Sequence, residues 1–89
     1  MTNKITVQDK ILYELSIRNR WISVTDIMRF TNLKLHSVHR ALQRLKQRGF
    51  ILKKKEIISN SSGPPINMIY IKIKNRHFVE SYLETKGIW

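Results

Sequence analysis

The sequence of 89 residues contains no cysteine, which excludes disulfide bonds and thiolate metal sites. It has only three glycines and two prolines, and the prolines are neighbours at positions 64 and 65. No apolar run approaches the length of a membrane span, and the N-terminus lacks the apolar core of a signal peptide. A chain of this length supports one small core, so we expect residues 1–89 to form a single domain. We also expect a soluble cytoplasmic protein with no membrane partner.

Acidic residues are also scarce, with six Asp and Glu against 17 Lys and Arg, which gives a formal net charge of +11. None of the six lies between Asp26 and Glu56, whereas nine basic residues do. A field of this sign attracts polyanions and repels other copies of the chain. The alternatives are a solvated charged face or an anionic membrane surface, but a membrane-surface helix usually carries bulkier apolar anchors over a longer stretch. The charge therefore favours nucleic acid as the partner.

Residues 34–48 are predicted to form an amphipathic helix, which Gly49 ends in the left-handed conformation. At 100° per residue, one side of this helix is apolar and carries Leu35, Val38, Ala41, Leu42 and Leu45. The opposite side is polar and cationic and carries His36, Arg40, Gln43, Arg44 and Gln47. A helix that lies in the major groove of DNA needs this division between a buried face and a face of hydrogen-bond donors.

The rest of the chain predicts two further helices and a hairpin around this segment. Thr6 and Asp9 form a capping box for a first helix, whose buried side is Val7, Ile11, Leu12 and Leu15. A short strand at Trp21 and Ile22 precedes Ser23, which caps a second helix that runs to residue 30. Residues 51–58 and 66–74 are rich in β-branched side chains and predict two strands joined by a polar loop. Asn75 caps a short last helix that ends at Gly87.

This order resembles the winged-helix (winged helix-turn-helix) transcriptional regulators, including the MarR-like and related small archaeal, plasmid and viral regulators. The likeness is carried by residues 33–51: leucine, valine, arginine, paired apolar positions, then a closing glycine and a bulky apolar residue. Residues 23–32 are similar to the preceding helix and turn. The resemblance implies an α+β winged helix-turn-helix fold with a three-helix core, a β-hairpin wing and a short C-terminal helix. It also implies binding of duplex DNA, with helix 34–48 in the major groove and hairpin 51–74 as the wing.

The predicted hairpin departs from the family pattern at its tip. In many members the tip carries an arginine that enters the minor groove, whereas residues 59–65 here are serine, asparagine, glycine and proline. The basic residues lie on the strand instead, at Lys53, Lys54 and Lys55. We therefore expect phosphate contacts from the strand in place of minor-groove readout. Because neighbouring strand residues point to opposite sides, at most two of the three lysines can reach one partner.

Arg40 and Arg44 are the best candidates for contacts with base edges or phosphates. An arginine that bonds guanine through two donors contributes about 1–3 kcal/mol of discrimination between bases. Lys34 stands at the helix start and could meet a phosphate together with free backbone N–H groups. Four residues that share or flank the outer face are secondary candidates: His36, Ser37, His39 and Gln43. Lys46 and Arg48, near the far end of the helix, are interpreted as surface charge, and simple solvation is the alternative for every residue of this group.

Catalysis and metal binding have little support in the sequence. His36 and His39 have the i, i+3 spacing of metal ligands, as do His77 and Glu80. No cysteine or nearby carboxylate completes the first pair, and Arg40 would repel a cation. The chain has no glycine-rich phosphate loop and no nucleophile beside a base. We therefore expect no enzyme activity, metal, cofactor or small-molecule substrate.

Apolar side chains on the first and last helices predict a homodimer. Tyr13 and Ile17 point away from the predicted core side of the first helix, and four more crowd the end of the chain: Phe78, Tyr82, Ile88 and Trp89. These six residues either pack on one another within one monomer or form a two-fold interface. We favour the interface, which would hold two recognition helices about 34 Å apart along one face of DNA.

The sequence therefore predicts a dimeric, sequence-specific duplex DNA-binding protein that regulates transcription. We expect it to be associated with the nucleoid or, for a viral chain, to lie in the host cytoplasm. One alternative is a winged-helix protein-interaction module, which would need an apolar outer face on the third helix. Another is an adaptor for RNA or single-stranded nucleic acid, including a replication accessory role. Such an adaptor would need aromatic stacking residues on the basic face.

Overall fold

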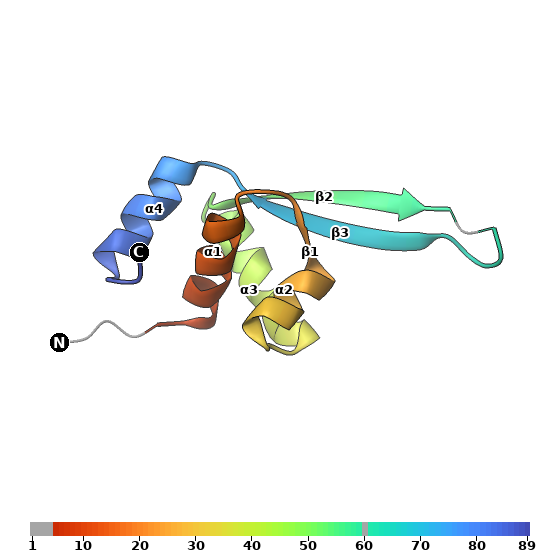
Figure 1. The fold of residues 1–89 in the computed structure, drawn as a ribbon, viewed down its shortest axis with the longest axis horizontal. Helices are drawn as coiled ribbons and strands as arrows, with labels where there is room; N and C mark the ends of the chain where they lie inside the picture. Colours follow the sequence, from red (N-terminus) through yellow and green to blue (C-terminus); the bar gives the residue numbers. More distant parts are fainter. Residues whose placement is uncertain (1–4, 60) are drawn as a thin grey trace.

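The computed structural model describes residues 5–59 and 61–89 and shows a small α+β fold that is consistent with a winged helix (Figure 1). Its elements are α1 (Val7–Arg18), β1 (Ile22–Ser23), α2 (Val24–Thr31), α3 (Leu35–Gln47), β2 (Ile51–Ile58), β3 (Ile66–Ile73) and α4 (Arg76–Thr85). The predicted element order is confirmed, and the predicted bounds differ from the observed ones by about one residue. The predicted first strand, for example, lies one residue further along the chain.

Side-chain caps define where three of the helices begin. The Thr6 hydroxyl accepts from the Asp9 N–H at 3.2 Å, and the Asp9 carboxylate accepts from the Thr6 N–H at 2.9 Å. Ser23 accepts from the Asp26 N–H at 3.1 Å to start α2, and Asn75 accepts from the Phe78 N–H at 3.1 Å to start α4. These predicted caps are confirmed. Gly49 has a φ of +79°, as predicted for the end of the third helix.

The core lies between the three N-terminal helices and one side of the sheet. Ile11, Ile27, Val38 and Leu45 are fully buried, as is Ile71 of β3. α4 completes the core from the end of the molecule by burying Val79 and Leu83.

Two predicted core positions are wrong. Val7 is 37% exposed and Leu35 is 50% exposed. Each is the first residue of its helix, α1 and α3 respectively. The buried residues of α3 begin one turn later, at Val38. Helical periodicity assigns a residue to a side of the helix, but it does not say where along the axis the packing partner ends.

The sheet is antiparallel, in the order β1-β3-β2, and most of it is the β2–β3 hairpin. β1 pairs only with Ile71 and Tyr70 of β3, close to the helices. The hairpin register runs from Ile51 opposite Ile73 at the base to Ile58 opposite Ile66 near the tip. The tip therefore projects well beyond the helices, as Figure 1 shows.

A buried carboxylate ties α4 to the start of α1. Asp9 is fully buried, accepts a 2.6 Å hydrogen bond from the Tyr82 hydroxyl and lies 3.3 Å from the Lys86 Nζ atom. Burial acts to raise the pKa of Asp9, but hydrogen bonds from Thr6, Tyr82 and Lys86 outweigh it and hold the pKa below its ordinary value of 3.8. Because the folded pKa is lowered, this stabilisation is present above about pH 4 and is lost as the pH falls through the folded value.

We expect Asp9→Asn to lower the free energy of unfolding by about 2 kcal/mol at pH 7, because charge-assisted hydrogen bonds are lost. The deficit relative to wild type should shrink as the pH falls below about 4 and towards the lowered pKa of the folded wild-type carboxylate. Urea denaturation at pH 7 and at pH 3 measures both effects. Asp26→Asn is the matched control, since Asp26 is also a first-turn aspartate but is more exposed. Equal pH dependence in the two variants would contradict the assigned role of Asp9.

Candidate nucleic-acid interface

The core holds α3 so that its polar side faces outward. Val38, Ala41, Leu42 and Leu45 are buried, and the turn that brings α2 into α3 passes through Asn32 in the left-handed conformation. The opposite side of the helix is exposed and presents the predicted contact residues His36, His39, Arg40, Gln43 and Arg44, with Ser37 half-buried among them. The predicted division of the helix into a buried and an outer face is therefore confirmed from Val38 onward.

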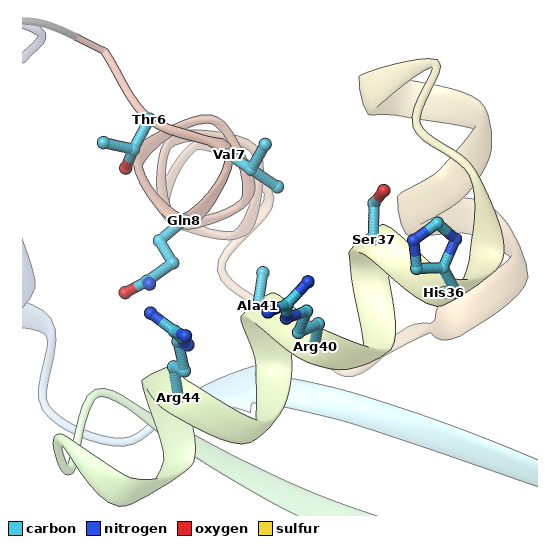
Figure 2. Close-up of a pocket in the computed structure, with 8 residues that line it drawn as sticks. All are labelled: Thr6, Val7, Gln8, His36, Ser37, Arg40, Ala41 and Arg44. Atoms are coloured by element: carbon cyan, nitrogen blue, oxygen red, sulfur yellow. The ribbon is translucent and has the colours of Figure 1, made fainter.

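One side of α3 borders a hollow of about 480 Å³ shared with the first turn of α1 (Figure 2). α3 contributes His36, Ser37, Arg40 and Arg44, and α1 contributes Val7 and Gln8. Figure 2 shows Arg44 and Gln8 facing each other across this hollow. The start of α1 adds the positive end of a helix dipole to the two arginines. This side of α3 is therefore electropositive.

The other side of α3 borders a second hollow of about 320 Å³, shared with the hairpin. Its floor is apolar and includes Leu42, Ile51, Ile69 and Ile71, and its rim is His39, Gln43, Lys46 and Lys53. α3 is thus a polar ridge with a basic hollow on each side. A helix that lies in the major groove has a phosphate backbone along each of its sides, so basic groups on both sides of the helix suit this position.

The structure separates the three lysines of β2. Lys53 lies on the α3 side with Ile51, and Lys55 shares that side by alternation and pairs with Ile69. The Lys54 side chain points to the opposite side, where its Nζ atom lies 4.6 Å from the centre of the Trp21 ring and 3.2 Å from a Glu56 carboxylate oxygen. Lys53 and Lys55 therefore lie on the α3 side of the hairpin, and Lys54 lies on the other side. This arrangement agrees with the expectation that at most two of the three lysines can reach one partner.

Two basic residues that were interpreted as surface charge have distinct positions. Lys46 lies on the rim of the second hollow, where its i+3 and i+7 spacing from Gln43 and His39 could have indicated it. The Arg48 side chain instead donates a 2.6 Å hydrogen bond to Gln8 and lies over the rings of Phe50 and Tyr82, at 4.6 and 5.2 Å. Arg48 therefore braces the end of α3 against α1 and α4.

The first turn of α1 was missed as part of this surface. Thr6, Val7 and Gln8 lie about 30 positions before α3 in the chain, and only the packing of α1 on α3 brings them together. Their residue types do not indicate that they belong to this surface. Backbone N–H groups can contribute to anion binding whatever the side chain, so the sequence does not reveal their contribution.

Charge is segregated between two groups of elements. Residues 34–74 hold ten Lys and Arg against the single acidic residue Glu56, so they carry a net +9 of the total +11. α1 holds two acidic and two basic residues, and α4 with Lys86 does the same. The α3 and hairpin region is therefore cationic, whereas the region of α1 and α4 is balanced.

The predicted dimer residues fall into separate groups. Tyr13 and Trp89 meet edge to face with ring centroids 6.2 Å apart, beside a hollow of about 340 Å³ that Tyr13, Phe30 and Ile88 help to line. Ile17 is half-exposed one helical turn after Tyr13. Tyr82 and Ile88 are engaged within the monomer, by the bond to Asp9 and by packing on the core. Phe78 stacks on Phe50 at the other end of α4, with ring centroids 4.9 Å apart.

The described residues also bear on metal binding and on membrane insertion. Within residues 5–59 and 61–89, no cluster of three or more His, Asp or Glu side chains could hold a metal ion. No helix in this part of the chain is both long enough and apolar enough to cross a membrane.

Comparison with known proteins adds a likeness of fold. No protein-family model matches this sequence, and no curated protein sequence is similar to it. Among solved structures, a "possible transcriptional regulator" from Methanosarcina mazei Go1 superposes on 92% of this chain with a TM-score of 0.68 and 12% sequence identity. The chain spans 66% of the length of that protein. The helices and hairpin described above thus share their fold with a protein of that description.

Proposed function

We propose that this protein binds duplex DNA in a sequence-specific manner and regulates transcription, with α3 in the major groove. The observation that carries the proposal is the position of α3, a polar ridge between two hollows with basic rims. The concentration of net charge in residues 34–74 supports it, because phosphate neutralisation dominates the affinity of proteins for DNA. Its proposed type is the MarR-like or small archaeal, plasmid or viral regulator, and the likeness to the archaeal protein supports the fold that this type requires.

The residues of this surface divide into two roles. Arg40 stands on the outer face of α3 and is assigned to a base edge, with His36, His39 and Gln43 as neighbours that read adjacent bases. Arg44 and Ser37 are assigned to the phosphates on the α1 side. Lys34, the N-cap residue of α3, is assigned to a phosphate beside the start of that helix. Lys46, Lys53 and Lys55 are assigned to the phosphates on the hairpin side.

The active form is proposed to be a homodimer that joins through α1 and the end of the chain. The balanced charge of α1 and α4 makes this the region where two copies of a +11 chain repel each other least. Tyr13, Ile17 and Trp89 offer an apolar patch there, which Ile5 extends. A two-fold axis through this patch leaves both α3 helices free for DNA.

The outer face of α3 argues against the two alternatives. It carries no Phe, Tyr or Trp side chain on which a single-stranded base could stack. Apart from Leu35 at its first residue, its exposed residues are polar or charged, which does not suit an apolar protein partner. Competition between duplex DNA, single-stranded DNA and RNA, repeated at several salt concentrations, tests this preference.

Arg40→Ala is expected to weaken binding to the preferred duplex by about 10- to 100-fold and to relax sequence preference. The preferred duplex is first obtained by selection from a random pool, and affinities are then compared with those for a random duplex. Arg29→Ala removes the same charge from an exposed position on α2 and serves as control. If Arg40→Ala weakens both duplexes equally, Arg40 does not read bases.

Lys53→Gln is expected to weaken binding to every duplex several-fold and to reduce the slope of log affinity against log salt by about one. Lys54→Gln should have a clearly smaller effect, because Lys54 faces away from α3 and is paired with Glu56. Fluorescence anisotropy across a salt series measures both quantities. Equal slopes for the two variants would place the hairpin in a different orientation on DNA.

Ile17→Lys is expected to convert the dimer into a monomer, because it places a charge in the apolar patch. Sedimentation at micromolar concentration should then give the monomer mass of 10.6 kDa. Leu35→Lys is the control, since Leu35 is equally exposed at 50% but lies at the start of α3. A wild-type protein that sediments as a monomer would refute this interface without affecting the DNA-binding surface.

A further inference from the structure

The β2–β3 hairpin has an apolar face on the side turned away from α3, which we call the outer face. The register and the alternation of the strands place five apolar residues on it, namely Leu52, Ile58, Ile66, Met68 and Tyr70. Three charged residues complete it, namely Lys54, Glu56 and Lys72. Leu52, Ile58 and Ile66 are each between 41% and 49% exposed. A sheet face in water is usually polar, so this composition indicates a contact surface.

The proposed DNA contact does not cover the outer face, on which the Trp21 ring lies beside Lys54. Lys53 and α3 lie on the inner side of the hairpin, around the second hollow. A duplex bound along α3 therefore meets the inner side, and the outer face is directed away from that contact. Among the described elements, the helices that pack on the sheet lie toward its base, and the tip extends beyond them (Figure 1).

We propose that the outer face binds the outer face of a second copy of this chain on the same duplex, an inference that rests on the proposed function. A two-fold axis across the middle of the hairpin pairs β2 with β2 in opposite directions. In that arrangement Leu52 faces Ile58 of the second copy, and Lys54 faces its Glu56. On β3 the same axis sets Met68 opposite Tyr70, and Ile66 opposite the aliphatic stem of Lys72. The face is thus self-complementary, as a two-fold contact requires.

The small area of the outer face means that this contact forms on DNA and not in free solution. Two strands of eight residues present on the order of 400 Å² per copy, about half of the roughly 800 Å² per partner in a standard stable interface. Such a contact is too small to hold two cationic copies together in free solution. On DNA the phosphates neutralise the charge and bring copies close together, so a weak contact becomes effective there. Its result is cooperative binding.

The first test compares a short duplex that holds one dimer of the protein with a long duplex that holds several dimers. Wild type is expected to bind the long duplex with higher affinity per site and with a Hill coefficient above one. The double variant Ile58→Thr with Ile66→Thr should lower affinity for the long duplex about tenfold while leaving the short duplex unchanged. Ile57→Thr is the matched control for the single variant Ile58→Thr, because Ile57 lies on the inner side of the same strand, and it should keep the cooperativity of wild type.

The outcomes separate this inference from the proposed function. Failure of wild type to bind either duplex would overturn the proposed function and, with it, this contact. Equal affinity per site for short and long duplexes, or full cooperativity in the double variant, would overturn the outer-face contact alone. Circular dichroism melting confirms that the variants fold, and threonine suits a strand that is half-exposed.

A second test uses the absence of native cysteine, which makes single cysteines diagnostic. A mixture of Leu52→Cys protein and Ile58→Cys protein should form a mixed disulfide on the long duplex under mild oxidation, since the two positions face each other across the axis. Little should form without DNA, or when Ile57→Cys replaces Ile58→Cys. Equal cross-linking of the Ile57→Cys protein would overturn the proposed arrangement of the two hairpins.

Discussion

Burial of one side of α3 is the constraint on which the rest of the structure depends. Val38 and Leu45 are fully buried, and the helix can hide them only by turning its opposite side to the solvent. That opposite side carries Arg40 and the residues around it. The same packing sets α1 on one flank of α3 and the hairpin on the other. The orientation of the polar ridge is therefore a consequence of the core.

The positions of the acidic residues determine where the electrostatic field of the molecule is strongest. Glu56 is the single acidic residue within residues 34–74, and its carboxylate pairs with Lys54 on the outer face of the hairpin. No acidic side chain in that segment thus weakens the field on the side of α3. The helices α1 and α4 carry a balanced charge. One small domain in this way holds a cationic surface and a surface of balanced charge at once.

The network around Asp9 connects these two regions. Asp9 joins the start of α1 to Tyr82 and Lys86 at the end of α4, and Arg48 joins the end of α3 to Gln8 in the first turn of α1. The bond that fastens the end of α3 and the bond that fastens α4 therefore both end in the first turn of α1. In a chain of this length, with a small core and no disulfide bonds, such polar ties supply rigidity that packing alone cannot.

The sequence by itself determined the element order, the caps at Thr6, Ser23 and Asn75, and the outer face of α3, because these depend on local spacing and short-range hydrogen bonds. Tertiary structure alone decided that Lys53 and not Lys54 lies beside α3, since alternation separates the two without saying which side the helix covers. Tertiary packing also placed the first turn of α1 beside α3. It left Leu35 exposed, because the core ends before the first residue of α3. These features depend on contacts between segments far apart in the chain, and periodicity carries no information about them.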